Sequence, residues 1–279
     1  MCQLILTISK GRNFRAYVRK SVSGGGEVRA FIAMAKKEFL ESIRTYKLLI
    51  VATVFLLFGM LNPITAKIMP KLLSSFMPEG MTITLGEPHT VDSWIQFYKN
   101  MSTQLILFVI VFSGIVSNEL TKGTLINMLT KGLPRKTVIL SKFTAIISIW
   151  TVSYLICFVI TLVYTMYLLP GELPNIIFAA CCMWLFGVLE ISMMLLGGAL
   201  SGSIYGSLLL AGGFAGVLML ANIFPKLEEY NPYLLSTGCV SLLTSERVPS
   251  DFYVSIIVTL AFILLIMISS ICSFNKKQI

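Results

Sequence analysis

Glu190 is the only ionisable side chain well inside one of the long apolar runs of the chain. A carboxylate in the middle of a membrane-crossing helix costs roughly 2.5–3.5 kcal/mol, so such residues are rare and often functional. The surrounding Leu, Met, Val and Ile residues each return a few tenths of this cost, so the helix still inserts. Two interpretations stay open: Glu190 forms an intramembrane polar site that contacts a substrate or a proton, or it faces a helix bundle and bonds to a neighbouring Ser or Thr.

The residue types that catalysis and metal binding require are otherwise scarce. His89 is the only histidine, and the chain contains no Gly-x-x-x-x-Gly-Lys-Ser/Thr sequence. A metalloprotease inside the membrane needs paired histidines, and a nucleotide site needs the phosphate-binding loop. The sequence therefore predicts no catalytic residues, no metal site and no cofactor bound by this chain.

The polar segment 118–142 offers chemistry of another kind, the binding of a partner. It contains one acid, Glu119, and five basic residues, and it lies between two long apolar runs. Within it Leu125, Met128 and Leu129 fall on one side of a predicted helical turn, which Gly132 and Pro134 end. A short amphipathic helix of this kind fits the groove of a soluble partner. The alternative is a plain loop that only sets the membrane topology.

These residues must be positioned by membrane-spanning helices. The chain has 279 residues, of which 56% are apolar and only 13% charged, whereas soluble domains carry about 25% charged residues. Runs of roughly 20 apolar residues indicate helices that cross a bilayer. We predict an all-α integral membrane protein with six spans, at about 48–66, 101–118, 143–169, 176–200, 204–224 and 252–273.

The basic residues indicate how the spans are oriented. Seventeen of the 22 lie before residue 48, in 118–142 or at Lys276 and Lys277, and five lie in the other loops, which also hold eight acids. Because Lys and Arg are retained on the inside of the membrane, both termini and the 118–142 segment are predicted to be cytoplasmic. The positive charge is then explained by anionic lipid rather than by nucleic acid.

The first 47 residues divide into two parts. Residues 1–27 form either a basic arm on the membrane or an over-long reading frame that really begins at Met34. Residues 28–47 show helical periodicity, with Val28, Ile32 and Ile43 among the residues of one apolar face. This pattern predicts an amphipathic helix at the membrane interface, leading into the six-span domain within 28–279.

Two outer segments are long enough to fold. Residues 67–100 contain several Pro and Gly residues and predict a small cap. Residues 225–251 mix apolar and polar positions, which predicts a short helix that dips back into the outer leaflet.

Three sequence motifs, in order along the chain, resemble those of one family. They are Lys36-Lys37-Glu38-Phe39 in the amphipathic helix, Glu119 followed by Gly123-Thr124 after the second span, and Pro134-Arg135 with the downstream Lys142. Together with six spans over 34–279, they resemble the membrane subunit of an ABC transporter of the type-2 exporter family. The direct Pro134-Arg135 pair departs mildly from that family, in which a small residue often intervenes.

The resemblance implies a permease in a bacterial cytoplasmic membrane that uses ATP bound to a separate ABC ATPase subunit. It implies a homodimer or heterodimer of permeases that exports a hydrophobic or amphipathic substrate, and second and fifth spans that face the central cavity, with Phe108 and Phe112 as pore-lining residues. The segment 118–142 would couple the pore to the ATPase, through Glu119, Lys122, Gly123, Thr124, Leu125, Met128, Leu129, Pro134, Arg135 and Lys142.

A second hypothesis needs no transport at all. The chain could be a membrane scaffold or immunity-type subunit that binds a partner. The stoichiometric presence of a soluble ATPase would separate the two hypotheses.

Overall fold

The computed structural model describes residues 26–75, 87–121, 123, 129–130, 133–171 and 174–276. Within these residues every regular element is a helix, and six helical segments are long and apolar enough to cross a membrane. The predicted all-α fold with six spans is therefore confirmed at this level. The side to which each end of the bundle faces stays a prediction.

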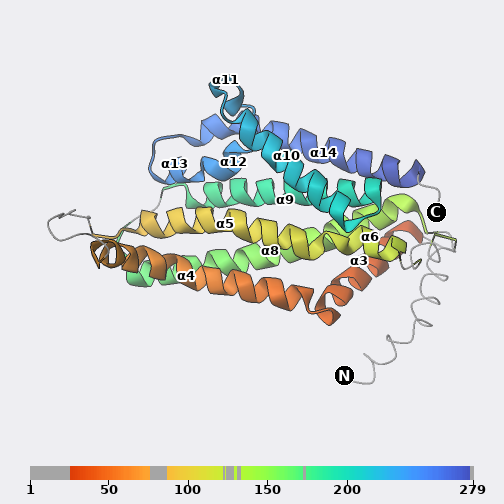
Figure 1. Cartoon of the computed structure of the whole chain (residues 1–279), viewed down its shortest axis with the longest axis horizontal. Coiled ribbons are helices and arrows are strands. Elements are labelled where there is room, and N and C mark those ends of the chain that lie inside the picture. Colours follow the sequence, from red (N-terminus) through yellow and green to blue (C-terminus); the bar gives the residue numbers. More distant parts are fainter. Residues whose placement is uncertain are drawn as a thin grey trace.

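The six long segments run side by side along the longest axis of the molecule (Figure 1). The second segment is divided by a break at Ser113 between α5 and α6. The elements are α3 (Gly26–Arg44), α4 (Lys47–Ser75), α5 (Thr90–Phe112), α6 (Gly114–Thr121), α8 (Arg135–Leu168), α9 (Ile176–Ser201), α10 (Ile204–Ala221), α11 (Pro225–Glu228), α12 (Leu234–Thr237), α13 (Cys239–Leu243), the 3-10 helix η1 (Pro249–Phe252) and α14 (Tyr253–Lys276).

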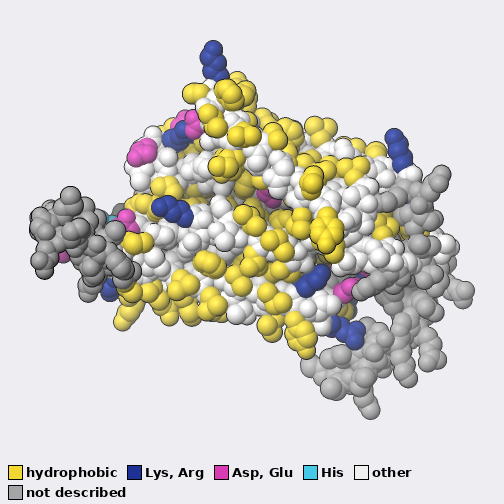
Figure 2. Space-filling view, viewed as in Figure 1, with side chains coloured by type: hydrophobic (Ala, Val, Ile, Leu, Met, Phe, Trp, Pro, Cys, Tyr) yellow, Lys and Arg dark blue, Asp and Glu magenta, His cyan; other side chains and the backbone are white. Residues whose placement is uncertain are grey.

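The surface of the bundle is apolar along most of its length. Figure 2 shows hydrophobic side chains spread over the visible face. Large side chains such as Leu57, Val163, Leu209 and Leu264 are more than half exposed on four different helices. Contiguous apolar surface on this scale is unfavourable in water and suits the hydrocarbon of a bilayer. The structure thus supports a multi-pass membrane protein.

The N-terminal helix α3 turns sharply into α4. Tyr46 adopts a left-handed backbone conformation with φ 58°, which separates the two helices. α3 packs against α8 and buries Ala30, Ala33 and Met34. Val28 and Ile32, from the predicted apolar face, stay exposed on the outside. The location of this face in the membrane interface stays a prediction.

The described parts of the two outer segments contain helices joined by short turns. In 67–100, α4 continues through Pro63 and Pro70 to Ser75 and α5 already begins at Thr90, so these parts lengthen the neighbouring helices. Residues 76–86 lie outside the described residues, and the predicted cap stays a prediction. In 225–251, α12 and α13 pack against α9 and α5, with Leu235 and Leu242 fully buried.

Candidate functional site

Two buried polar features stand out, at different heights in the bundle. The first is an ion-pair network of Lys37, Glu38, Glu41, Glu119 and Lys142, which joins α3, α6 and α8. The second is an apolar groove between α5, α9 and α10 that contains Glu190.

Lys142 is the centre of the network. It lies in the second turn of α8, and its side chain is 0% exposed. Its Nζ donates to Oε1 of Glu38 at 2.9 Å and to the carbonyl oxygen of Ile115 at 2.9 Å, and it forms an ion pair with Glu119. Two of the three N–H donors of the ammonium group thus make hydrogen bonds, and Glu119 adds a direct charge contact.

Lys37 closes the network from the α3 side. Its Nζ lies 3.1 Å from Oε1 of Glu38 and 3.0 Å from Oε2 of Glu41, and it also contacts Oε1 of Glu119. Burial alone would lower the pKa of Lys37, but the charges of Glu38, Glu119 and Glu41 outweigh it and raise the pKa above its usual value. Lys37 therefore remains positively charged at neutral pH.

The three carboxylates of the network could in principle hold a cation. Their ligand atoms lie within 4.8 Å of one another. The ammonium groups of Lys37 and Lys142 already contact the same oxygens, so two built-in cations take the place that a metal would occupy. We therefore assign no metal to this site.

Two predicted coupling residues, Glu119 and Lys142, are brought together here as a direct ion pair. Lys37 and Glu38 were part of the first sequence motif, but the sequence did not indicate that they join the same site. The available signal was the stripe Ala30, Met34, Glu38, Ser42 at a spacing of four residues, which places one acid on the face that is buried.

Other predicted coupling residues lie near the ends of α6 and α8. Gly123 has φ 66° just after α6, and Leu129 packs partly buried against the core. Pro134 precedes the first turn of α8, and Nη1 of Arg135 donates to the carbonyl oxygens of Phe274 and Asn275, each at 2.9 Å. Lys122, Thr124, Leu125 and Met128 lie outside the described residues.

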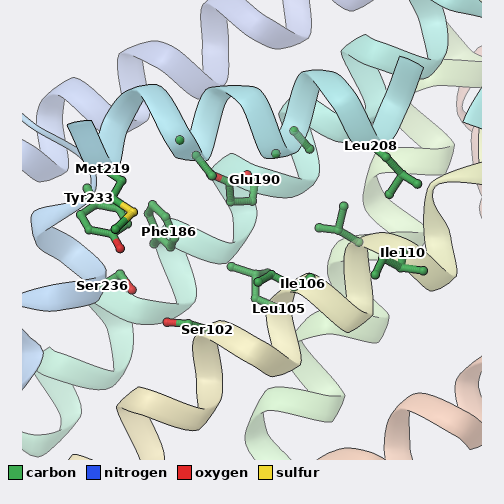
Figure 3. Close-up of a pocket in the computed structure, with 15 residues that line it drawn as sticks. Ser102, Leu105, Ile106, Ile110, Phe186, Glu190, Leu208, Met219, Tyr233 and Ser236 are labelled. Carbon is green, nitrogen blue, oxygen red and sulfur yellow. The ribbon is translucent and has the colours of Figure 1, made fainter. Parts of the chain in front are cut away.

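The groove encloses about 290 Å³. Ser102, Leu105, Ile106, Val109 and Ile110 of α5 form one wall. Phe186 and Glu190 of α9 form the floor, and α10 and α12 complete the groove through Leu208, Ala211, Gly212, Ala215, Gly216, Met219, Tyr233 and Ser236. Figure 3 shows Glu190 between an apolar end of the groove, with Ile110 and Leu208, and an end with hydroxyl groups, with Ser102, Tyr233 and Ser236.

Glu190 has no polar partner in the groove. The residue is 4% exposed, and its Oε1 atom makes no hydrogen bond to the part of the chain that the structure describes. The neighbouring Ser192 instead donates to the carbonyl oxygen of Val188 at 2.7 Å. The second interpretation from the sequence expected Glu190 to bond to a neighbouring Ser or Thr. Ser192 does not form such a bond.

Phe108 and Phe112 lie in the core of the chain. Both are fully buried, and their ring centroids are 4.7 Å apart. Phe108 also packs edge-on against Trp150 at 5.3 Å. Neither residue lines the groove, to which the second span contributes Ile106, Val109 and Ile110. The role of Phe108 and Phe112 in lining a central pore stays a prediction.

Comparison with known proteins adds no assignment. No protein-family model matches the chain, and no curated protein is significantly similar to it in sequence.

Proposed function

We propose that this chain is the membrane-spanning permease subunit of an ATP-driven exporter of the ABC type. In this proposal it works as a dimer of permeases in the cytoplasmic membrane. A separate ATPase subunit binds the ATP and contacts the 118–142 segment. The substrate is hydrophobic or amphipathic.

The observation that carries the proposal is the ion-pair network. It ties α3 to α6 and α8, and α6 and α8 are the helices on either side of the proposed coupling segment. Removing one partner from a buried ion pair costs about 3–5 kcal/mol, because the other charge is left without compensation. The three helices therefore resist separation at the network, and a force on the coupling segment would move them as one unit.

This rigidity suits a transport cycle driven from the cytoplasm. Closure of two ATPase subunits around ATP would displace the coupling segment and α3 together. The two six-helix bundles would then shift between inward-open and outward-open arrangements, as in other rigid-body transitions. Nucleotide drives the cycle only if the ATPase binds the two arrangements with different affinity.

The first test is the identity of the partner. The tagged full chain, purified from its native membrane in mild detergent, is expected to bring a soluble ATP-binding subunit in a one-to-one ratio. Recovery of a stoichiometric partner that does not bind ATP would support the scaffold hypothesis and overturn the permease.

The second test is coupling. Changing Leu125 and Met128 to Asp should abolish ATPase binding, because charges replace the predicted apolar docking face. The matched control is Val248→Asp, an exposed apolar residue of the segment 225–251, predicted to be on the outer side. Unchanged ATPase binding by the double variant would contradict the assignment of the coupling face.

A further inference from the structure

We propose that the groove between α5, α9 and α10 binds a hydrophobic molecule that carries a protonated amine, with the ammonium group paired to Glu190. This inference deepens the proposed function and rests on it for the transport step. The binding itself requires neither ATP nor a partner.

The first argument is the incomplete bonding of Glu190. Its Oε1 atom has no hydrogen-bond partner among the described residues although the residue is 4% exposed. A charged carboxylate is costly in an apolar environment unless it is paired and hydrogen-bonded. The described residues that line the groove include no Lys, Arg or His. A cation that pairs with a charged Glu190 would therefore come from outside the described residues.

The second argument is the open wall on α10. A Cβ atom added at Gly212 or Gly216 would meet nothing within 4 Å, so these glycines leave free space instead of allowing two helices to approach. Elsewhere on the same pair of helices, a Cβ added at Gly197 would lie 2.7 Å from the carbonyl oxygen of Gly206. α9 and α10 are thus tightly packed at one end and bordered by the groove at the other.

The third argument is the distribution of polarity. Ile106, Ile110 and Leu208 provide apolar surface on one side of Glu190, and Ser102, Tyr233 and Ser236 provide hydroxyl groups on the other (Figure 3). Ligand sites typically combine apolar walls with a few polar groups that fix orientation. The arrangement fits an apolar body, an amine at its middle or end, and a further polar group near the hydroxyls.

The amine has two possible sources, a membrane-soluble cargo and an aminophospholipid. Glu190 lies about 14 residues after the start of α9 at Ile176 and 11 before its end at Ser201, which is roughly 21 Å and 17 Å along the axis. Phospholipid ammonium groups lie at the membrane surface, far from this depth. The position favours a cargo molecule, and the experiment below distinguishes the two sources.

The test uses the purified full chain in phosphatidylcholine nanodiscs. The probe is a dansyl fluorophore joined by a hexyl chain to a primary amine, and its control is the same compound ending in a methyl group. Empty nanodiscs correct for partitioning into lipid. We expect the wild type to bind the amine at least about tenfold more tightly than the methyl compound, which corresponds to 1.4 kcal/mol.

Three variants locate the site. Glu190→Gln should remove the preference for the amine while leaving weak binding of both compounds. Gly216→Leu should fill the groove and weaken both compounds at least about tenfold. Gly213→Leu is the matched control, because an added Cβ there also meets open space but the residue does not line the groove, and it should bind like the wild type.

The outcomes separate the hypotheses. A wild type without preference for the amine, or a Glu190→Gln variant that keeps it, would overturn the inference. Displacement of the probe by added phosphatidylethanolamine would identify a lipid as the source, and no displacement would identify a cargo. Binding without ATP-driven transport would contradict only the proposed function, whereas a coupled ATPase without amine binding would contradict only this inference.

Discussion

Lys142 and Glu190 are both ionisable residues buried inside the helix bundle, yet their surroundings are opposite. Lys142 contacts Glu38, Glu119 and a backbone carbonyl. Glu190 faces an apolar groove in which the described lining residues offer no cation. A charge whose partners are all supplied by the chain holds helices together, whereas a charge left without a partner is available to a ligand. Burial by itself therefore does not distinguish a structural residue from a binding residue.

The largest change in stability is expected when Lys142 is replaced. Lys142→Met keeps the length of the side chain but removes the fully buried one of the two cations that Glu38 and Glu119 share, so the free energy of unfolding should fall by about 3–5 kcal/mol. Unfolding in mixed micelles with increasing SDS measures this change. Lys99→Met, at an exposed position, is the control and should stay within about 0.5 kcal/mol of the wild type. A loss below 1 kcal/mol at Lys142 would show that the network is not structural.

Two glycine substitutions test the difference in packing between the core and the groove. A Cβ at Gly187 would lie 2.3 Å from the ring of Trp150, so Gly187→Ala should destabilise the protein by about 1–3 kcal/mol through overpacking. Gly212→Ala on the groove wall should be neutral or stabilising by up to about 1 kcal/mol, since Ala favours a helix more than Gly. The same unfolding assay tests both, and equal effects would contradict the open space on α10.

The pH dependence of stability tests the contribution of Lys37 to the network. Its pKa is raised from the ordinary 10.5 by the adjacent carboxylates, so the stability that its charge supplies is fully present below pH 10.5 and is lost only as pH rises through the higher folded-state pKa. Lys37→Met should lower the free energy of unfolding by about 1–3 kcal/mol, and this difference should be the same at pH 7 and pH 9. A difference that shrinks between these two values would show that Lys37 loses its proton in the folded state.

The smallest effect is expected at Glu190. Glu190→Gln removes a buried acid that has no partner to lose, so the free energy of unfolding should change by less than about 1 kcal/mol or rise. Thermal unfolding in the same detergent measures it. A large loss would mean that Glu190 has a structural partner and would place it with Lys142.

The sequence predicted the helices better than the site. The fourth span was predicted at 176–200, and α9 covers Ile176–Ser201, because an uninterrupted apolar run has clear ends. The third span was predicted to begin at residue 143, but α8 begins at Arg135. The sequence predicts Lys142 in a loop because of its charge. A charged residue can lie in a helix when its partner is close in space, and here that partner is Glu38, 104 residues earlier.

The candidate site could be predicted only in part for the same reason. Glu119, Lys142 and Glu190 were recognisable as unusual residues in the sequence. That the first two share an ion pair, and that Glu190 borders a groove, depends on how α3, α5, α9 and α10 pack. Periodicity within one helix contains no information on which helix lies beside it.

The 104 residues between Glu38 and Lys142 also impose an order on biogenesis. When α3 leaves the ribosome, Lys37 already accompanies Glu38, but Lys142, the second cation that contacts Glu38, has not yet been synthesised. α3 packs mainly against α8, so most of its contacts can form only after α8 has been synthesised. Until Lys142 is made, Lys37 is the cation of the network that contacts Glu38, so the network is completed only late in synthesis.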